Sequence, residues 1–306
     1  MSIEVDQIEY VKNLSCIDEK QLQGKGDDED PPEKHVKLYP SLLGAIAWCI
    51  MTRIDICIYV AALQRHGKAP KVGHIKKMNI LLRYMKENPL VLLAQKLTPP
   101  VKLMAVGDAA FRREPDDKGL AMRGAVYLLI ETKQELGGKC NILEFYSRKQ
   151  AHVVRSTWGA ELCQLSDCCD FLLLLAGFLT EIQTGELSAR QLRDMVDGVE
   201  NCEKPAIDLE ACVDAQSVFS GITAEQVRIP AERHTLYHAQ WIRELLDRGI
   251  LRKLWWIDTR DCCADGLTKG AVLRDALRCV ARGEWKVLHP ALPWTSTGLV
   301  LQSSSS

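Results

Sequence analysis

Hydrophobic residues recur at helical spacing between residues 39 and 88. The segments LLGAIAWCIM and ICIYVAALQRH carry wide apolar faces, and HIKKMNILLRYMKEN places Ile75, Met78, Leu82 and Met85 on one face. This period of about 3.6 residues predicts helices that each bury one side. Prolines at 70, 89, 99 and 100 punctuate the region, and the last pair predicts a domain boundary.

The pattern then changes to the alternation of β-strands. The segments VKLMAVGD, AMRGAVYLLIET and CNILEFYSRK predict three strands, the last two joined by a turn at ELGGK. A helix capped by Ser156 follows, then the strand AIDLEACVD, a short helix from residue 215, and a helix ending at Gly249. The strand ILRKLWWID and a closing helix near Cys262 complete the pattern. This order predicts an α/β fold with a five-stranded mixed sheet flanked by helices.

These patterns divide the chain into four predicted regions. Residues 1–36 are polar and contain GKGDDEDPPEK, so they are predicted to be disordered or a linker. Residues 37–98 form a small helical region, and residues 99–290 form the α/β domain. The serine-rich residues 291–306 are predicted to be a disordered tail.

Charge is distributed unevenly, although the net charge is only −1 and the composition is that of an ordinary globular protein. Residues 4–33 carry ten acids against three bases, whereas residues 36–96 carry ten bases against two acids. A basic segment that includes Lys76 and Lys77 suits a polyanionic partner. A solvated helical face explains the same pattern equally well.

The cysteines, the first residues and the longest apolar stretch bear on the cellular compartment and on the type of metal site. Twelve cysteines are present, but no pair of C-x-x-C motifs supports a zinc site. The first residues lack the basic and apolar regions of a secretory signal, and Arg53 and Asp55 interrupt the longest apolar stretch. We therefore expect reduced cysteines, an intracellular location (cytoplasmic or nuclear), and no membrane partner.

Four carboxylates occupy settings that can converge. Asp108 and Asp214 each end an apolar strand, Glu161 lies in the second turn of a helix, and Asp265 follows the last strand. Strand ends and helix starts can meet at one edge of a mixed sheet, and together they would make a metal site. Taken singly, each acid has a structural explanation: a strand-end or helix cap, a favourable helix-dipole position, or a solvated surface.

Several motifs occur in the order found in one family. YPSLLGAIAWCIMTRIDICIYVAALQRH and LLRYMKENP are similar to segments of the type Y-x-S-L-x-G, T-R-x-D-I and L-R-Y-L-K. AVGDAAF, FYSRKQAHVVRSTWGAEL, VDAQSV and WIDTRDCCADGLTKG resemble the family's four acidic motifs and supply Asp108, Glu161, Asp214 and Asp265 in turn. Over roughly residues 37–290 the chain resembles the C-terminal part of copia-type retrotransposon Pol polyproteins, namely the connection region and the RNase H domain.

The resemblance implies an RNase H-like fold and a divalent-metal-dependent endoribonuclease that cleaves the RNA strand of RNA–DNA hybrids. Two Mg²⁺ or Mn²⁺ ions would be held by the four acids. Asp108 would bridge the ions, Glu161 and Asp214 would hold the ion near the leaving group, and Asp265 the ion that activates water. A reverse transcriptase domain of the parent polyprotein would be a further partner.

Contacts to nucleic acid are expected from Arg148, Lys149 and Gln150, which leave a strand close to Glu161, and from His234, which matches a histidine of the family. The chain departs from the family pattern at Ala110 and Ala215 and contains no Y-x-D-D polymerase motif. Two alternatives therefore stay open. One is a catalytically decayed domain that only binds nucleic acid or a protein, and the other is an integrase-like enzyme that cuts DNA on the same fold.

Overall fold

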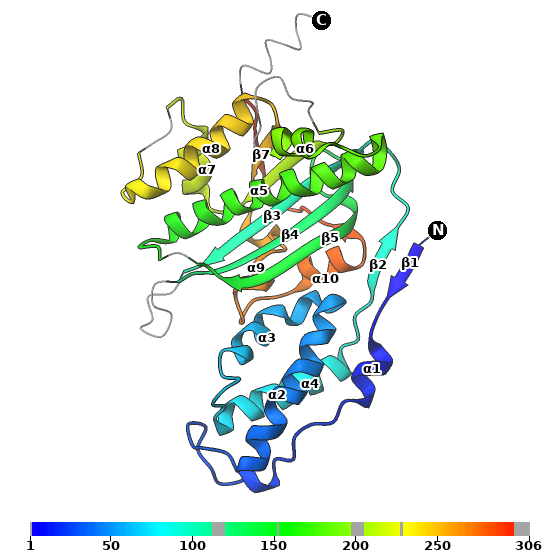
Figure 1. Ribbon diagram of the computed structural model, residues 1–306, viewed down its shortest axis with the longest axis vertical. Helices are drawn as coiled ribbons and strands as arrows, with labels where there is room; N and C mark the ends of the chain where they lie inside the picture. Colours follow the sequence, from blue (N-terminus) through cyan, green and yellow to red (C-terminus); the bar gives the residue numbers. More distant parts are fainter. Residues whose placement is uncertain (1, 112–119, 152, 197–204, 227–228, 297–306) are drawn as a thin grey trace, which may run out of the picture. The chain divides into compact units, whose positions relative to one another are not determined.

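The computed structural model describes residues 2–111, 120–151, 153–196, 205–226 and 229–296. The chain divides into two compact units, Met1–Ala94 (unit 1) and Gln95–Ser306 (unit 2) (Figure 1). The division falls between residues 94 and 95, whereas the proline pair suggested a boundary between residues 98 and 99.

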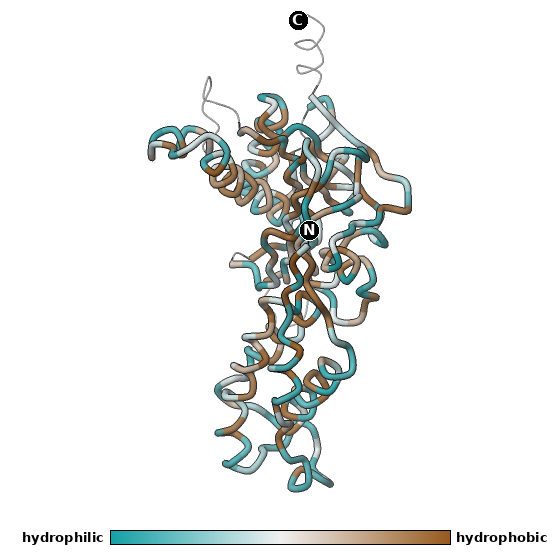
Figure 2. Tube along the Cα trace, turned by 90° about the vertical axis from the view of Figure 1, so that its right-hand side faces the viewer, coloured by the Kyte–Doolittle hydropathy of each residue, from teal (hydrophilic) through white to brown (hydrophobic). Residues whose placement is uncertain are grey.

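Unit 1 is mainly helical. Its elements are β1 (Ser2–Val5), α1 (Ile8–Asn13), α2 (Glu33–Trp48), α3 (Cys57–Gln64), α4 (Val72–Glu87) and β2 (Leu92–Gln95), whose last residue is the first of unit 2. Hydrophobic and hydrophilic stretches alternate along these helices (Figure 2). The buried faces of α2, α3 and α4 form one core around Tyr39, Ile46, Val60 and Ile75, as the helical period requires.

The structure corrects the prediction of disorder for residues 1–36. This segment contains β1 and α1, and Val11, Ile17 and Leu22 are buried in the core of unit 1. The side chain of Asn79 in α4 fixes it: Asn79 Oδ1 accepts from the Ile17 amide at 3.0 Å, and Asn79 Nδ2 donates to the Ile17 carbonyl at 2.8 Å. Isolated apolar residues in a polar segment carry no periodic signal, so only the tertiary contacts reveal this order.

Unit 2 contains a curled, mixed sheet of seven strands in the order β8-β5-β4-β3-β6-β7-β9. The strands are β3 (Val101–Ala110), β4 (Met122–Glu131), β5 (Gly138–Lys149), β6 (Asp208–Val213), β7 (Leu251–Trp256), β8 (Glu284–Trp285) and β9 (Leu292–Trp294). β4 pairs antiparallel with β3 and β5, whereas β6 pairs parallel with β3 and β7.

The number of strands corrects the sequence prediction. All five expected strands are present, but the short edge strands β8 and β9 extend the sheet to seven. Two or three residues cannot show alternation, and Pro293 within β9 argues against a strand unless it lies at an edge. β9 lies in the predicted disordered tail, while residues 297–306 lie outside the described residues.

Helices cover both faces of this sheet. The helices of unit 2 are α5 (Thr157–Thr184), α6 (Ala189–Val196), α7 (Gln216–Thr223), α8 (Leu236–Asp247), α9 (Asp265–Thr268) and α10 (Asp275–Ala281). Gly107 of β3 faces Gln164 of α5, whereas Gly124, which pairs with the next residue of β3, faces α9. Because neighbouring strand residues point to opposite faces, α5 and α9 lie on opposite sides (Figure 1).

Helix α5 has the length and apolar composition of a membrane-crossing segment. In unit 2, however, 61% of its most apolar window is buried, and Leu162, Leu165, Cys169, Leu172 and Ala176 pack in the main core of the unit. The core helix of a soluble protein passes the same test of length and composition. Its position in the fold explains the apolar sequence, because α5 spans the sheet.

Candidate metal centre

The four predicted acids come together at one edge of the sheet. Oxygen atoms of Asp108, Glu161 and Asp214 lie within 4.8 Å of one another, and so do ligand atoms of Asp214, Asp265 and Cys262. Asp108 and Glu161 are buried, at 0% and 5% exposure, and Asp265 is 9% exposed. Only Asp214 is half-buried. The structure therefore gathers residues that are separated by up to 157 positions in the sequence (265 − 108).

The parallel pairing of β3 and β6 places the first and third acids side by side. Asp108 is near the end of β3 and Asp214 follows β6 directly, and adjacent parallel strands end at the same edge. Ser156 caps α5 by accepting from the Gly159 amide at 3.0 Å. This fixes the first turns of α5 so that Glu161 Oε2 accepts from the Ala109 amide of β3 at 3.2 Å.

The position of Asp265 in the site depends on the close approach of α9 to the sheet. A Cβ at Gly124 would lie 2.6 Å from Leu267 Cβ and 2.9 Å from Thr268 Cγ2, so only glycine leaves room for α9 here. Ser147 of β5 holds the same helix by donating to the Leu267 carbonyl at 2.5 Å. The Thr268 hydroxyl then donates to Asp108 Oδ2, which joins α9 to β3 at the centre of the site.

Lys269 is a member of the site to which the sequence patterns assigned no role. Its Nζ lies 3.2 Å from Asp108 Oδ1 and also contacts Asp265 Oδ1. The spacing of four residues between Asp265 and Lys269 in DGLTK is a signal that could have indicated this contact. The contact to Asp108 has no such signal, because the two residues are far apart in the sequence.

Each of the four carboxylates is oriented by at least one donor. Besides the contacts of Asp108, Glu161 and Asp265, the Thr259 hydroxyl donates to Asp214 Oδ2 at 3.0 Å. Trp256 Nε1 donates to the Asp214 carbonyl at 2.9 Å and fixes the backbone after β6. Such donors hold ligand side chains in fixed orientations, which strengthens metal binding.

The crowding of negative charge changes the acidity of the site. Burial, followed by the neighbouring charges of Asp108 and Asp214, raises the pKa of Glu161 to about 10. Burial and Asp108 raise the pKa of Asp214 to about 6 and that of Asp265 to about 7. Burial disfavours the charge of Lys269, but Asp108, Asp265 and Asp214 outweigh it and raise its pKa. The site therefore favours any additional positive charge.

The donor set fits a hard divalent cation. Asp108, Glu161 and Asp214 offer three carboxylate oxygens within 4.8 Å, which suits Mg²⁺ or Mn²⁺. The second group contains the Cys262 thiol, which is buried, and burial together with the nearby acids raises its pKa well above the ordinary value. A protonated thiol is a poor ligand for Mg²⁺, so this group contributes only Asp214 and Asp265.

The predicted nucleic-acid contacts have different surroundings. Arg148 is exposed, with its guanidinium 4.3 Å from the Tyr146 ring centroid and 3.6 Å from Asp167. His234 is exposed and lies 4.0 Å from Glu232. The Gln150 side chain is buried, which removes it from the surface, and Lys149 is half-buried at the end of β5. Their role in binding stays a prediction.

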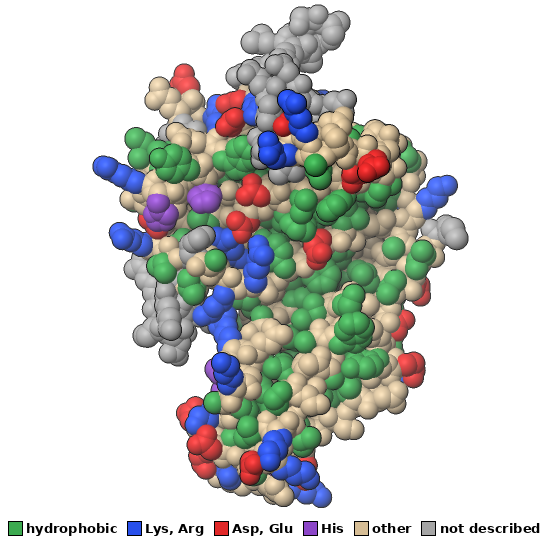
Figure 3. Space-filling model, in the orientation of Figure 1, with side chains coloured by type: hydrophobic (Ala, Val, Ile, Leu, Met, Phe, Trp, Pro, Cys, Tyr) green, Lys and Arg blue, Asp and Glu red, His purple; other side chains and the backbone are tan. Residues whose placement is uncertain are grey.

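Lys76 and Lys77 lie on α4 in unit 1, a different unit from the four acids. Lys76 Nζ is 2.8 Å from Asp27 Oδ1, and Lys77 is exposed. Lys71 and Arg83 of the same unit also pair with acids of the N-terminal segment, Asp30 and Glu19. Basic and acidic side chains accordingly lie close together on unit 1 (Figure 3). These ion pairs join basic side chains of residues 36–96 to acids of residues 4–33.

The chain is similar to a curated protein. It is a retrovirus-related Pol polyprotein from transposon RE1 of Arabidopsis thaliana, which is 24% identical over 240 residues. The match covers 78% of this chain but 14% of that polyprotein. No family model matches the chain, and no solved structure matches it. The similarity supports a retroelement-derived protein, as the order of the sequence motifs indicated.

Proposed function

We propose that unit 2 is a ribonuclease H that uses divalent metal ions to cleave the RNA strand of RNA–DNA hybrids. The observation that carries the proposal is the convergence of Asp108, Glu161, Asp214 and Asp265 from four separate elements onto one sheet edge. The strand order β5-β4-β3-β6-β7, with three antiparallel strands followed by two parallel ones, supports it as an RNase H-like arrangement. The similarity to a transposon Pol polyprotein supports a hybrid as substrate.

In this proposal Asp108, Glu161, Asp214 and Asp265 hold two Mg²⁺ or Mn²⁺ ions, which when bound activate water and stabilise the leaving oxygen of a phosphodiester. The protein supplies the order of the site. The Ala109 amide, the Thr259 hydroxyl and the Thr268 hydroxyl keep Glu161, Asp214 and Asp108 in their orientations before substrate arrives. Choice of the RNA strand would depend on contacts to 2′-hydroxyl groups.

The test is Mg²⁺-dependent cleavage of an end-labelled RNA–DNA hybrid by the full chain. Asp108→Asn keeps the size of the side chain but removes its charge, and we expect it to lower the cleavage rate at least about a hundredfold. Asp208→Asn is the matched control, because Asp208 is an exposed acid at the start of β6, at the opposite end from Asp214. Cleavage that is equally fast with Asp108→Asn would contradict the proposal.

The same assay separates the alternatives. Binding of the hybrid without cleavage at saturating Mn²⁺ would favour a decayed nucleic-acid-binding domain. Cleavage of duplex DNA in preference to the hybrid would favour an integrase-like enzyme. We expect 5′-phosphate and 3′-hydroxyl products from the RNA strand alone.

A further inference from the structure

Lys269 places a positive charge within the group of four acids. Its ammonium lies 3.2 Å from Asp108 Oδ1 and contacts Asp265 Oδ1, so a single positive group bridges two of the four acids. Among the described residues, it is the lysine that makes ion pairs with these acids. Four carboxylates around one ammonium leave the centre short of positive charge even when Lys269 is charged.

The four acids differ in the donors that contact them, and the donors divide the site into a half with Glu161 and Asp214 and a half with Asp265. Glu161 and Asp214 accept from a backbone amide and a hydroxyl, which are neutral donors. With Asp108 they form the group of three carboxylates suited to one divalent ion. Asp265 is instead bonded to the ammonium of Lys269, and the third member of its group is the thiol of Cys262. The Asp265 half therefore already contains its cation and lacks a third hard ligand.

Lys269 is also placed so that it can leave. It is the C-terminal cap of the short helix α9, and its side chain is 33% exposed. Arg274 holds the backbone of Lys269 by donating to its carbonyl at 3.1 Å, so the side chain can turn outward without moving α9. A lysine has four rotatable side-chain bonds and a strongly hydrated ammonium, which suits such a movement.

We propose that Lys269 acts as a built-in replacement for the second metal ion, so that the free protein binds one divalent ion and admits the second only when Lys269 is displaced. This inference rests on the proposed metal-dependent function. It makes Lys269 a residue that controls the order of metal loading, and a phosphate group of the substrate is the anion chemically suited to draw the ammonium away.

The experiment measures Mn²⁺ binding to the full chain without nucleic acid, by titration calorimetry and by the electron paramagnetic resonance signal of free Mn²⁺. The wild-type protein is expected to bind one ion. Lys269→Met, which removes the charge and keeps an unbranched side chain one atom shorter, is expected to bind two ions, or one at least about tenfold more tightly. Lys269→Arg keeps the charge and should bind one ion.

Lys286→Met is the control, because Lys286 pairs with Glu284 at 3.4 Å and is 52% exposed. Folding of each variant is checked by circular dichroism, and Lys269→Gln replaces Lys269→Met if the latter unfolds. Two ions in the wild type, or identical binding by the wild type and the neutral Lys269 variant, would overturn the role of Lys269 while leaving hybrid cleavage free to succeed. If neither the wild type nor any variant binds Mn²⁺, this inference is overturned. If the wild type also fails to cleave the hybrid, the proposed function is overturned.

Discussion

The ion pairs of unit 1 contrast with the group of acids at the sheet edge of unit 2, a unit that also contains ion pairs of its own, such as Lys102 with Glu210. In unit 1, Lys76 pairs with Asp27 at the surface, and Arg53 pairs with Asp55 in the core. In unit 2, four acids of the same sign gather around Lys269. Paired charges serve the fold of unit 1, whereas gathered charges oppose folding in the absence of a cation. This contrast makes the edge of the sheet in unit 2 the candidate site.

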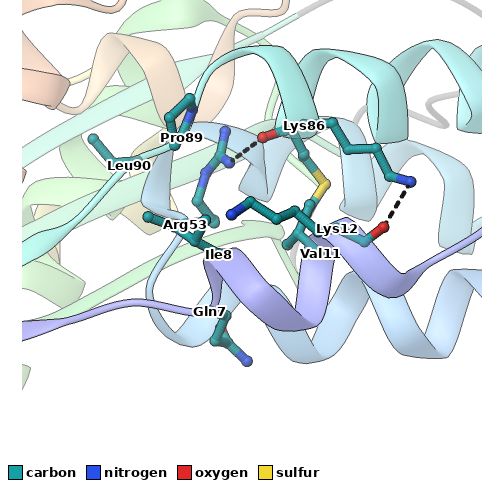
Figure 4. A pocket seen from close by; sticks show the side chains of 9 residues that line it. Gln7, Ile8, Val11, Lys12, Arg53, Lys86, Pro89 and Leu90 are labelled. Atoms are coloured by element: carbon teal, nitrogen blue, oxygen red, sulfur yellow. Dashed lines mark hydrogen bonds between the residues drawn. The ribbon is translucent and has the colours of Figure 1, made fainter.

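The ion pair between Arg53 and Asp55 in the core of unit 1 gives the TRIDI segment, residues 52–56, a structural role. Arg53 donates to both oxygens of Asp55 at 2.9 Å and to the Met85 carbonyl at 3.1 Å, and the Tyr84 hydroxyl donates to Asp55. Arg53 lines a cavity of about 10 Å³ with Val11 and Pro89 (Figure 4). This space holds about one water molecule. The network is therefore structural, and the cavity is too small for a ligand.

Breaking this pair should have the largest effect on stability. Arg53→Met leaves the Asp55 carboxylate buried without its ion-pair partner, and we expect a loss of about 3–5 kcal/mol in the free energy of unfolding of unit 1. Urea unfolding followed by circular dichroism measures it. In the double variant Arg53→Met/Asp55→Leu the loss should be smaller, because no buried charge is left alone. A loss below about 1 kcal/mol in the single variant would contradict the structural role.

A glycine substitution tests whether the close packing of α9 against the sheet positions the acids of the site. Gly124→Ala places a Cβ 2.6 Å from Leu267 Cβ, so we expect a loss of about 1–3 kcal/mol and weaker Mn²⁺ binding, because α9 must move away from Asp108. Gly44→Ala in α2 is the control, since no atom lies within 4 Å of its added Cβ. That change should stabilise the protein by about 0.5–1 kcal/mol. Unchanged metal binding by Gly124→Ala would show that α9 is not held by close packing.

The gathered acids predict the dependence of stability on pH. The folded pKa values of Glu161, Asp214 and Asp265, about 10, 6 and 7, lie above their ordinary values of 4.5 and 3.8. Between pH 4 and 7 the folded protein therefore holds protons that the unfolded chain releases, and stability falls as pH rises. We expect the Tm of the metal-free protein to drop by at least about 4 °C over this window.

Mg²⁺ should reverse this loss, most strongly at pH 7 and above, because it binds the ionised carboxylates of the folded state. Glu161→Gln should flatten the dependence on pH, because the amide does not titrate. Thermal unfolding in EDTA and in Mg²⁺ at several pH values measures both effects. A metal-free Tm that rises steadily from pH 4 to 7 would show that these acids are not crowded in the folded protein.

The surface pairs of unit 1 should have the smallest effect. Lys76→Met removes the half-buried ion-pair partner of the exposed Asp27, and we expect no measurable change in Tm, because surface pairs contribute little. The same variant tests whether the basic segment binds a polyanion. If Lys76 contacts a phosphate, the dependence of hybrid binding on salt concentration should weaken by about one unit of slope. An unchanged slope would remove Lys76 from the candidate contacts.

The sequence by itself predicted most of the helices and strands of residues 37–290 and the four acids that the structure brings together. The alternation of apolar and polar residues in the strands and the helical period around Glu161 are local signals. The strand pattern predicts five of the seven strands, including the one that contains Asp108. Short edge strands and the buried N-terminal segment were missed, because β8, β9 and Ile17 depend on partners distant in the chain. Local periodicity carries no information about such contacts.

Only the tertiary structure decided which charges meet. The contrast between residues 4–33 and 36–96 suggested a binding surface, yet Lys76 and Lys71 pair with acids of the other segment. Conversely, nothing near Asp108 in the sequence indicates Lys269, which Gly124 brings to it by admitting α9 to the sheet. Electrostatic interaction depends on distance in space, so the folded chain, and not the order of residues, sets which charges cancel and which collect.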